Sequence, residues 1–455
     1  MSRTLMVSIS GIRGIFGSGL DPDVLVRFSS AYAAWVKAES TTAKVVIGRD
    51  ARVTGGLCAR IVSATLEAAG IDVVDLGLAT TPTVEMAVIG LGAGGGIVLS
   101  ASHNPAEWNA LKLLNSKGEF LSPEEGQEVI RLADAEVEPT VTWDRIGSYS
   151  QASYLDEHIQ AILDLEFIDP EPIARRDFRV VVDGINSVGG VAIPALLRRL
   201  GLRDEQIVCL NCEPTGRFAH VAEPLPENLV ETIAAVGESG ADLGIVVDPD
   251  ADRLALIQDG GVYLSEELTQ VVAADFLWGF RNGPFVTNLS SSRAIEDVAA
   301  RHGNDVYRSA VGEINVVKKM QAVDAVLGGE GNGGVILPDL HYGRDALVGT
   351  AMILQHLANQ NASLSDIRAG LPTYHIVKQK TEIGELDPDG LLERMAERYA
   401  GERISTIDGV KIDFDEGWVH MRKSNTEPII RVYSEATTED QARSLGERFM
   451  QELVS

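Results

Sequence analysis

The sequence contains little cysteine, an excess of acidic over basic residues, and no long hydrophobic run. Three cysteines among 455 residues cannot form a disulfide framework, which favours a reducing, cytoplasmic environment. Cys209 and Cys212 are two residues apart, but no second pair follows, so we interpret them as buried strand cysteines rather than a metal or redox pair. Asp and Glu (66) outnumber Lys and Arg (39), and the net charge of −27 argues against a nucleic-acid surface.

No segment of the sequence is expected to enter a membrane. The longest weakly polar run, residues 87–101, is too short to span a bilayer and is interrupted by glycines. The first eleven residues contain an early arginine and no apolar core of the kind that signal peptides have. We therefore expect a cytoplasmic protein. Its acidity does not exclude a small anionic substrate, because a few local cations can outweigh a distant acidic surface.

The sequence does contain a recurring order of apolar strand, polar loop and helix. A chain of 455 residues is too long for one compact core. Over most of the chain the alternation predicts α/β domains with parallel strands joined by right-handed crossovers. From about residue 372 the order becomes β-α-β-β-α, which predicts a small α+β domain. We expect α/β domains at residues 1–150, 151–255 and 256–371, followed by the α+β domain at 372–455.

Ser102 lies in the most informative of the polar loops. Residues 97–99 are apolar and are typical of a buried parallel strand, which Asn104-Pro105 ends. Ser102 and His103 are therefore expected at the carboxyl end of a strand, where open α/β sheets bind their ligands. A hydroxyl group at such a place can carry a phosphoryl group. The loop alone does not establish this function, because Ser, His and Asn are also common turn formers.

A second polar loop follows the apolar strand predicted at residues 242–247. It contains three aspartates at alternate positions: Asp248, Asp250 and Asp252. Such a loop can direct three carboxylates at one hard cation, and Mg²⁺ with a phosphate ligand fits it best. A solvated acidic turn is the alternative, but like charges this close beside a buried strand need a counterion. An EF-hand is excluded, because Arg253 and Asp259 occupy the positions that require Gly and Glu.

Two further loops have compositions suited to a sugar phosphate. Residues 422–428 combine two cations, polar side chains and turn amides, which suits a phosphate dianion, and Arg431 follows; a basic hairpin turn is an equally good interpretation. Residues 328–334 contain five glycines, which allow close approach of a ligand to the backbone. Glu330 and Asn332 could bind sugar hydroxyls there, although glycine-rich loops are usually flexible surface turns.

Taken together, these loops resemble those of the α-D-phosphohexomutase family, which comprises phosphoglucomutases, phosphomannomutases and phosphoglucosamine mutases. The matching motifs occur in the family's order and extend over essentially the whole chain: residues 10–14, 100–105, 248–253, 329–334 and 422–428. The serine and aspartate loops are highly specific. The resemblance implies three related α/β domains and a C-terminal α+β domain around a central cleft.

The resemblance also implies a role for each site residue. Ser102 is the expected phosphoserine, and the expected Mg²⁺ ligands are Ser102, Asp248, Asp250 and Asp252. The residues expected around the transferring phosphoryl group are Arg13, His103, Lys112 and Arg253, with Lys112 or His103 in general acid–base catalysis. The expected substrate-binding residues are Glu330, Asn332, Arg422, Ser424, Asn425, Thr426 and Arg431.

The implied enzyme is an isomerase that interconverts hexose 6-phosphate and hexose 1-phosphate, with hexose 1,6-bisphosphate as intermediate and activator. Mannose- and glucose-type relatives usually carry G-E-x-S-G-H in the sugar loop, where this chain has Asn332 and Gly334 in place of Ser and His. Residues 311–313 resemble the V-G-acidic segment of phosphoglucosamine mutases. The carboxylate of Glu313 would favour an amino sugar, because a protonated amino group requires a negative partner. The S-N-T form of residues 424–426 is instead common in mannose and glucose enzymes.

We therefore expect glucosamine phosphate as the substrate. A phosphomannomutase or phosphoglucomutase is the alternative, and a Mg²⁺-dependent sugar phosphatase, in which water accepts the phosphoryl group, is a more remote one. The expected partners are small hexose phosphates, with no nucleic acid and no membrane. The sequence leaves a monomer and a homodimer equally open.

Overall fold

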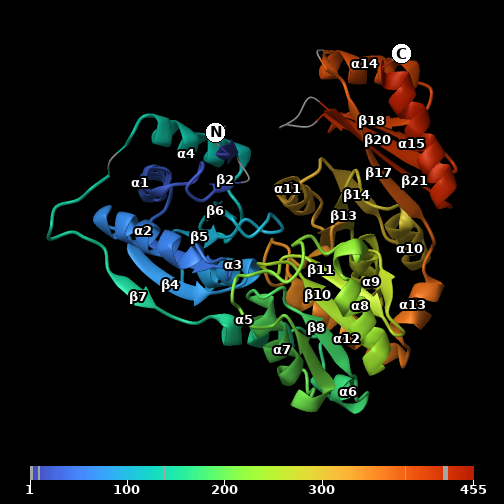
Figure 1. The fold of residues 1–455 in the computed structure, drawn as a ribbon, viewed down its shortest axis with the longest axis horizontal. Coiled ribbons are helices and arrows are strands. Elements are labelled where there is room, and N and C mark those ends of the chain that lie inside the picture. Colours follow the sequence, from blue (N-terminus) through green and yellow to red (C-terminus); the bar gives the residue numbers. More distant parts are fainter. Residues whose placement is uncertain (1–3, 9–10, 138, 385, 424–428, 455) are drawn as a thin grey trace. The chain divides into compact units, whose positions relative to one another are not determined.

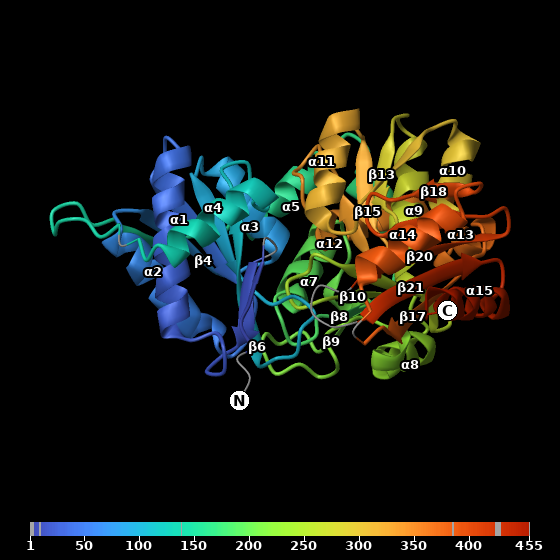
Figure 2. The same ribbon diagram turned by 90° about the horizontal axis from the view of Figure 1, so that it is seen from above.

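The structure, a computed structural model, describes residues 4–8, 11–137, 139–384, 386–423 and 429–454. The chain folds into two compact units, residues 1–269 with 332–368, and residues 270–331 with 369–455. Each unit contains β-sheets covered by helices (Figures 1 and 2). Among the described helices, none is both long enough and apolar enough to cross a membrane.

The first unit begins with a seven-stranded mixed sheet. Its strands lie in the order β1 (Met6–Ser8), β2 (Gly11–Ile15), β6 (Trp108–Leu114), β5 (Gly95–Leu99), β3 (Lys44–Arg49), β4 (Asp72–Leu78) and β7 (Tyr149–Gln151). The predicted parallel arrangement holds for β5, β3, β4 and β7. It is wrong for β1, β2 and β6, which pair antiparallel. The difference arises because the chain turns back after the Ser102 loop, so that β6 forms a hairpin with β5 instead of crossing over.

Helices cover both faces of this sheet. They are α1 (Pro22–Glu39), α2 (Gly55–Ala68), α3 (Thr81–Gly90) and α4 (Pro123–Asp134). Asp21 begins α1 as a cap, since its carboxylate accepts a hydrogen bond from the Val24 amide. Successive strand residues point to opposite faces, so Val45 and Ile47 pack with α1, α2 and α4, while Val46 packs with α3. The sheet therefore has two apolar faces, which is why its central strands read as continuous hydrophobic runs.

The second sheet places the aspartate loop. Its strands lie in the order β12 (Val262–Leu264), β11 (Leu254–Gln258), β10 (Leu243–Val247), β8 (Val180–Asp183) and β9 (Ile207–Leu210). β8, β9 and β10 are parallel, whereas β10 and β11 form an antiparallel hairpin whose connection is residues 248–253. The surrounding helices are α5 (Leu155–Leu163), α6 (Pro170–Arg175), α7 (Gly189–Arg199), α8 (Val230–Ser239) and α12 (Ala346–Gln360), with short 3-10 turns at Asp204–Gln206 and Pro226–Asn228.

The interpretation of the paired cysteines as buried is wrong. Cys209 is exposed, and Cys212 is only partly buried, whereas Cys58 is buried. β9 is the edge strand of its sheet, and its side chains range from buried at Ile207 to exposed at Cys209. The apolar run at residues 207–210 therefore does not bury every side chain in it.

The second unit contains the strands β14 (Val306–Ser309), β13 (Phe285–Asn288) and β15 (Leu327–Glu330), which lie parallel in this order. Its helices α10 (Ala294–His302) and α11 (Glu313–Val323) contact these strands. The helices α9 (Glu266–Trp278) and α13 (Leu364–Gly370) contain residues of both units, and β16 (Gly334–Ile336) belongs to the first unit.

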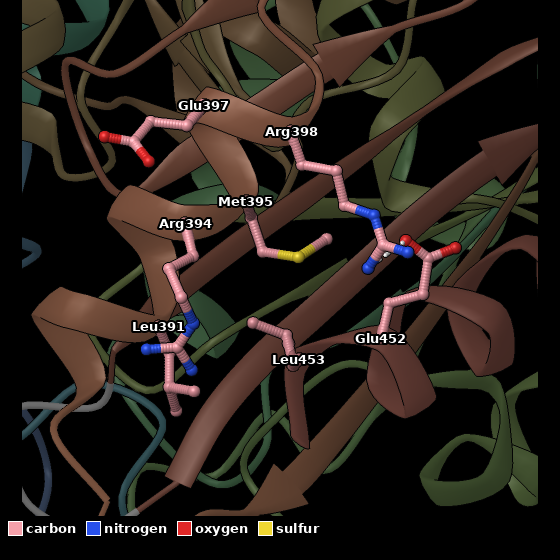
Figure 3. A pocket seen from close by; sticks show the side chains of 7 residues that line it. All are labelled: Leu391, Arg394, Met395, Glu397, Arg398, Glu452 and Leu453. Carbon is pink, nitrogen blue, oxygen red and sulfur yellow. Dashed lines mark ion pairs between the residues drawn. The ribbon is translucent and has the colours of Figure 1, made fainter. Parts of the chain in front are cut away.

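The C-terminal domain is an antiparallel sheet with two helices on one face (Figure 1). The strand order is β17 (His375–Glu382), β21 (Ile429–Ala436), β20 (Gly417–Lys423), β19 (Val410–Asp413) and β18 (Arg403–Ser405), and the helices are α14 (Pro388–Arg398) and α15 (Glu439–Val454). The sequence analysis missed β18 and β19, which are too short to show clear alternation. A cavity of about 470 Å³ is lined by residues of these two helices. Figure 3 shows the lining side chains, among which Arg398 and Glu452 form an ion pair.

Candidate functional site

Ser102 follows β5 in an unusual backbone conformation. Its φ of +48° lies in the left-handed region, which a non-glycine residue adopts only when surrounding contacts hold it there. The Ser102 amide donates a hydrogen bond to Ser100 Oγ (3.0 Å), and Ser102 Oγ donates to Asp248 Oδ2 (2.7 Å). The structure therefore brings the serine loop and the aspartate loop, 146 residues apart in sequence, into direct contact.

Arg52, which was not among the residues predicted from the sequence, holds the serine loop by hydrogen bonds. Its guanidinium is buried and donates to the carbonyl groups of Ser102 (2.5 Å), Asn104 (2.8 Å), Pro105 and Trp108 (3.1 Å). Nε donates to the carboxylate of Asp50 at 2.9 Å. Burial raises the pKa of Asp50, and Arg52 opposes that rise. A single planar group thus fixes four backbone carbonyls along the loop that presents Ser102.

The three aspartates are buried at the start of the β10–β11 connection. Asp248 Oδ1 accepts the backbone amides of Asp252 (3.1 Å) and Arg253 (3.2 Å), which fixes the loop. Lys112, which is on β6, lies 2.6 Å from Asp250 Oδ2 and 3.5 Å from Asp252 Oδ2. Burial lowers the pKa of Lys112, but the two aspartates outweigh it and raise the pKa above its usual range.

The pKa values of these carboxyl groups are displaced in opposite directions. Burial and then the charges of Asp252 and Asp250 raise the pKa of Asp248. Burial also acts to raise the pKa of Asp250, but the ammonium of Lys112 outweighs it and lowers that pKa. Carboxylates crowded in this way require cations, and Lys112, Arg344 and Arg253 each form an ion pair with at least one of them.

The donor set of the aspartate loop fits a hard divalent cation. Oxygens of Asp248, Asp250 and Asp252 all lie within 4.8 Å of one another. Asp250 Oδ1 and Asp252 Oδ1 are buried, and neither has a hydrogen-bond partner in the part of the chain that the structure describes. Buried oxygens without a partner are costly unless a ligand satisfies them, and carboxylate oxygens are the ligands that Mg²⁺ prefers.

Two more of the predicted residues, His103 and Arg13, lie near Ser102. His103 Nδ1 is 3.5 Å from Ser102 Oγ, and Arg13 on β2 donates to the Asn104 side chain at 3.5 Å. Burial, followed by the charges of Arg253, Arg344, Arg13 and Lys112, lowers the pKa of His103 to about 3. Burial and Arg253 also lower the pKa of Arg13. The site is therefore rich in positive charge, which suits a phosphoryl group.

Two residues that the sequence analysis missed contact the aspartates. Thr81, the first residue of α3, donates its hydroxyl to Asp250 Oδ2 (2.5 Å) and its amide to the Asp250 carbonyl (2.9 Å). Arg344, directly before the cap of α12, donates to Asp252 Oδ2 at 2.7 Å. Neither belongs to a motif that stands out in the sequence, because both reach the loop from other domains.

A second buried cluster lies in the same unit. His158 Nε2 is 2.9 Å and His341 Nε2 is 3.4 Å from Asp345 Oδ2, while His341 Nδ1 is 3.1 Å from Glu85 Oε2. Burial lowers the pKa of His341, but Asp345 and Glu85 outweigh it and raise the pKa to about 10. The imidazolium of His341 is thus held between two carboxylates, which offsets part of the cost of burying these charges.

The remaining predicted residues are distributed over both units. Asn332 accepts the Gly334 amide at 3.2 Å in the first unit. In the second unit, Glu330 is buried at the end of β15 and accepts from Asn288 (2.9 Å) and from the Gly312 amide (3.2 Å). Arg422 and Arg431 are cross-strand neighbours on β20 and β21. Ser424, Asn425 and Thr426 lie outside the described residues.

Four family models match the chain in succession. They are described as phosphoglucomutase/phosphomannomutase alpha/beta/alpha domains I (residues 5–139), II (153–261) and III (266–374), and the C-terminal domain (377–452). Together they extend over most of the 455 residues.

Individual relatives agree with these models over their whole length. A phosphoglucomutase/phosphomannomutase of Thermococcus kodakarensis is 36% identical over 98% of each chain. A probable phosphoglucosamine mutase of Methanopyrus kandleri is 34% identical over 97% of this chain and 96% of its own. The crystal structure of a phosphoglucomutase/phosphomannomutase family protein from Burkholderia thailandensis matches with a TM-score of 0.86 and 28% identity, over 98% of each chain.

The fold and the site thus define a phosphohexomutase with three α/β domains and a C-terminal domain built on an antiparallel sheet. The chain belongs to the phosphoglucomutase/phosphomannomutase family, the α-D-phosphohexomutases.

Proposed function

We propose that this phosphohexomutase interconverts glucosamine 6-phosphate and glucosamine 1-phosphate through phosphorylated Ser102. The observation that carries the proposal is the contact between Ser102 Oγ and Asp248 Oδ2 at 2.7 Å, beside two further buried aspartates. A nucleophile next to a divalent-cation site suits phosphoryl transfer, which depends on positioning and charge neutralisation more than on covalent chemistry.

Ser102 and the three aspartates would hold Mg²⁺, which when bound supplies charge neutralisation for the transferring phosphoryl group. In the first step the bond between phosphorus and Ser102 Oγ breaks, and the free hydroxyl oxygen of the hexose phosphate takes the phosphoryl group. That hydroxyl loses its proton to a base, for which His103 is the candidate, because its lowered pKa leaves the ring neutral and its Nδ1 lies 3.5 Å from Ser102 Oγ. Lys112, whose pKa is raised, is protonated and can give a proton to the leaving Ser102 oxygen as a general acid. The product is a 1,6-bisphosphate. In the second step the bond between phosphorus and the other hexose oxygen breaks, Ser102 Oγ loses its proton and takes that phosphoryl group, and the hexose oxygen is protonated.

Arg422 and Arg431 are proposed to bind the phosphate that does not react. Two cations directly opposite each other on neighbouring strands repel, and a bound dianion would remove this repulsion. Asp408, which lies 3.5 Å from Arg422 Nε, offsets part of the positive charge. Ser424, Asn425 and Thr426 would complete the phosphate loop. Glu330 and Asn332 are proposed to bind the sugar hydroxyls.

The choice of glucosamine rests on Glu313, the first residue of α11. A carboxylate near the 2-position of the sugar would favour a protonated amino group over a hydroxyl. The names of the relatives point both ways, because the Thermococcus protein is named for glucose and mannose and the Methanopyrus protein for glucosamine.

The test is a comparison of kcat/KM for the phosphates of glucosamine, mannose and glucose, with a trace of the matching 1,6-bisphosphate as activator. We expect glucosamine phosphate to have the highest value. A clear preference for mannose 1-phosphate would contradict the substrate proposal. Release of inorganic phosphate that equals or exceeds isomer formation would indicate a sugar phosphatase instead.

A further inference from the structure

Arg344 forms a buried ion pair with one of the three aspartates. Its Nη2 lies 2.7 Å from Asp252 Oδ2, and the side chains of Arg344 and Asp252 are 9% and 1% exposed. Two charges are buried together in this way only when their geometry is good, because each loses the solvation of water. Lys112 lies farther from the same oxygen, at 3.5 Å, and is closer to Asp250. Arg344 is therefore the nearer cation for the Asp252 carboxylate.

Asp250 and Asp252 use their two oxygens in the same way. Oδ2 of Asp250 accepts from Lys112 and Thr81, and Oδ2 of Asp252 accepts from Arg344. Oδ1 of each is buried, and among the described residues no hydrogen bond reaches it; Arg253 Nε lies 4.0 Å from Asp252 Oδ1, within ion-pair but not hydrogen-bond distance. One oxygen of each carboxylate is thus held by the protein, while the other remains available to a cation. Groups that hold metal ligands in this way commonly govern metal affinity.

The aliphatic part of the Arg344 side chain packs against Gly334, the first residue of β16. A Cβ atom at residue 334 would lie 2.3 Å from Arg344 Cδ and 2.8 Å from its Cγ, closer than any side chain tolerates. Gly334 does not have a positive φ, in contrast to Gly333, so its backbone does not require glycine. The space above Gly334 is therefore what excludes a side chain there, and Arg344 fills that space.

We propose that Arg344 is a positioning residue of the metal site, which keeps Asp252 oriented with one oxygen toward the cation, and that Gly334 is glycine in order to admit it. The inference rests on the proposed function only in taking the aspartate loop as the Mg²⁺ site. It does not depend on which hexose is the substrate. A role limited to packing would instead predict that Arg344 affects stability and leaves metal affinity unchanged.

The first test measures Mn²⁺ binding to the full-length protein by electron paramagnetic resonance, with Mn²⁺ as a probe of the Mg²⁺ site and without substrate. We expect Arg344→Gln to weaken Mn²⁺ binding by about 10- to 100-fold, the usual effect of losing a group that orients a metal ligand. Arg344→Lys should lie between this variant and the wild type, because lysine keeps the charge but not the planar fork. Activity lost in Arg344→Gln should be partly restored by high Mg²⁺ concentration.

The second test is a double-mutant cycle on the same measurement. Gly334→Ala should weaken Mn²⁺ binding because its methyl group displaces Arg344. In the Arg344→Gln background the same substitution should have little further effect, since the contact to be broken is already gone. Gly349→Ala, a glycine of α12 whose Cβ would meet the nearest atom at 3.1 Å, is the matched control and should bind Mn²⁺ as the wild type does.

The outcomes separate this inference from the proposed function. Equal Mn²⁺ affinities in the wild type and Arg344→Gln, or effects of Gly334→Ala and Arg344→Gln that simply add, would overturn the positioning role. Thermal unfolding in EDTA shows whether Arg344→Gln is still folded. If it is not, the Mn²⁺ affinities of Arg344→Lys and Gly334→Ala decide whether Arg344 is a positioning residue. Failure of the wild type to bind Mn²⁺ would overturn both proposals, and a wild type that binds Mn²⁺ but does not isomerise hexose phosphates would contradict the proposed function alone.

Discussion

The substitution Arg52→Lys should disable the serine loop while preserving the fold. The Arg52 guanidinium donates to five acceptors: one carboxylate oxygen of Asp50 and the carbonyl groups of Ser102, Asn104, Pro105 and Trp108. A lysine ammonium has about three donors in place of five and cannot span them. At least two of the five acceptors would lose their donor. Losing the donor to the buried Ser102 carbonyl would cost about 1–3 kcal/mol, and losing a donor to one of the partly buried carbonyls would cost less.

The structure indicates that this cost falls on the loop rather than on the whole domain. Lysine preserves the charge that Asp50 needs, so the buried pair is not broken outright. The loop, however, loses the contacts that hold Ser102 at its φ of +48°. A displacement of the nucleophile by about 1 Å can cost a factor of about 100, so we expect kcat to fall by about 100-fold.

The assay combines steady-state kinetics with hydrogen exchange of the backbone amides at residues 100–108. We expect kcat to fall much more than KM rises, and exchange to increase in this segment alone. Arg49→Lys is the matched control, because Arg49 lies beside Asp50 and contacts its carbonyl at 3.3 Å without reaching the serine loop carbonyls. An Arg52→Lys variant with wild-type kcat, or with faster exchange throughout the first domain, would refute the reasoning.

Three other predictions follow from the site and its surroundings. Ser102→Ala should abolish hexose-phosphate isomerisation and incorporation of phosphate into the protein, with an unchanged circular dichroism spectrum. A variant that isomerises hexose phosphate at the wild-type rate would contradict the role of Ser102 as the phosphorylated residue. Glu313→Gln should reduce kcat/KM for glucosamine phosphate more than for mannose phosphate, and equal losses would contradict its role in selecting the sugar. The pKa of His341 is about 10 in the folded protein and about 6.5 in the unfolded chain. Protonated His341 therefore stabilises the fold fully below pH 6.5, and its contribution to the free energy of unfolding falls by about 1.4 kcal/mol per pH unit as pH rises toward 10. Chemical unfolding at pH 7 and pH 9 should therefore show a loss in the wild type that His341→Gln lacks, and parallel losses would contradict this assignment.

The sequence predicted the parts of the site that depend on local order along the chain. Ser102 follows a strand, and three aspartates alternate after another strand, and both arrangements are local. Their direct contact could be expected only through the resemblance to a family, because 146 residues separate the two loops. The antiparallel return of β6 beside β5 was missed for a related reason: the loop after β5 is a hairpin, and only tertiary pairing distinguishes it from a crossover.

Arg52, Thr81 and Arg344 were not predicted, although each contacts the nucleophile loop or an aspartate. Arginine and threonine are common in loops and at helix starts, so none of the three has a local pattern that sets it apart. One signal was Gly334 in the sugar loop, where the mannose- and glucose-type pattern G-E-x-S-G-H has histidine. Glycine in place of a side chain indicates that something else fills the space, but the sequence does not say what does.

Arg52, Thr81 and Arg344 reach the serine loop or an aspartate from different parts of the chain. Arg52 and Thr81 come from the first α/β domain and Arg344 from the segment that precedes α12, while the aspartates come from the β10–β11 connection. Asp250 and Asp252 each have one oxygen held by another part of the chain, and their second oxygen has no hydrogen bond among the described residues. The local motifs therefore supply the reacting groups, and the packing of the domains against one another supplies their orientation. Substitutions that loosen this packing should lower metal affinity before they lower the stability of any single domain.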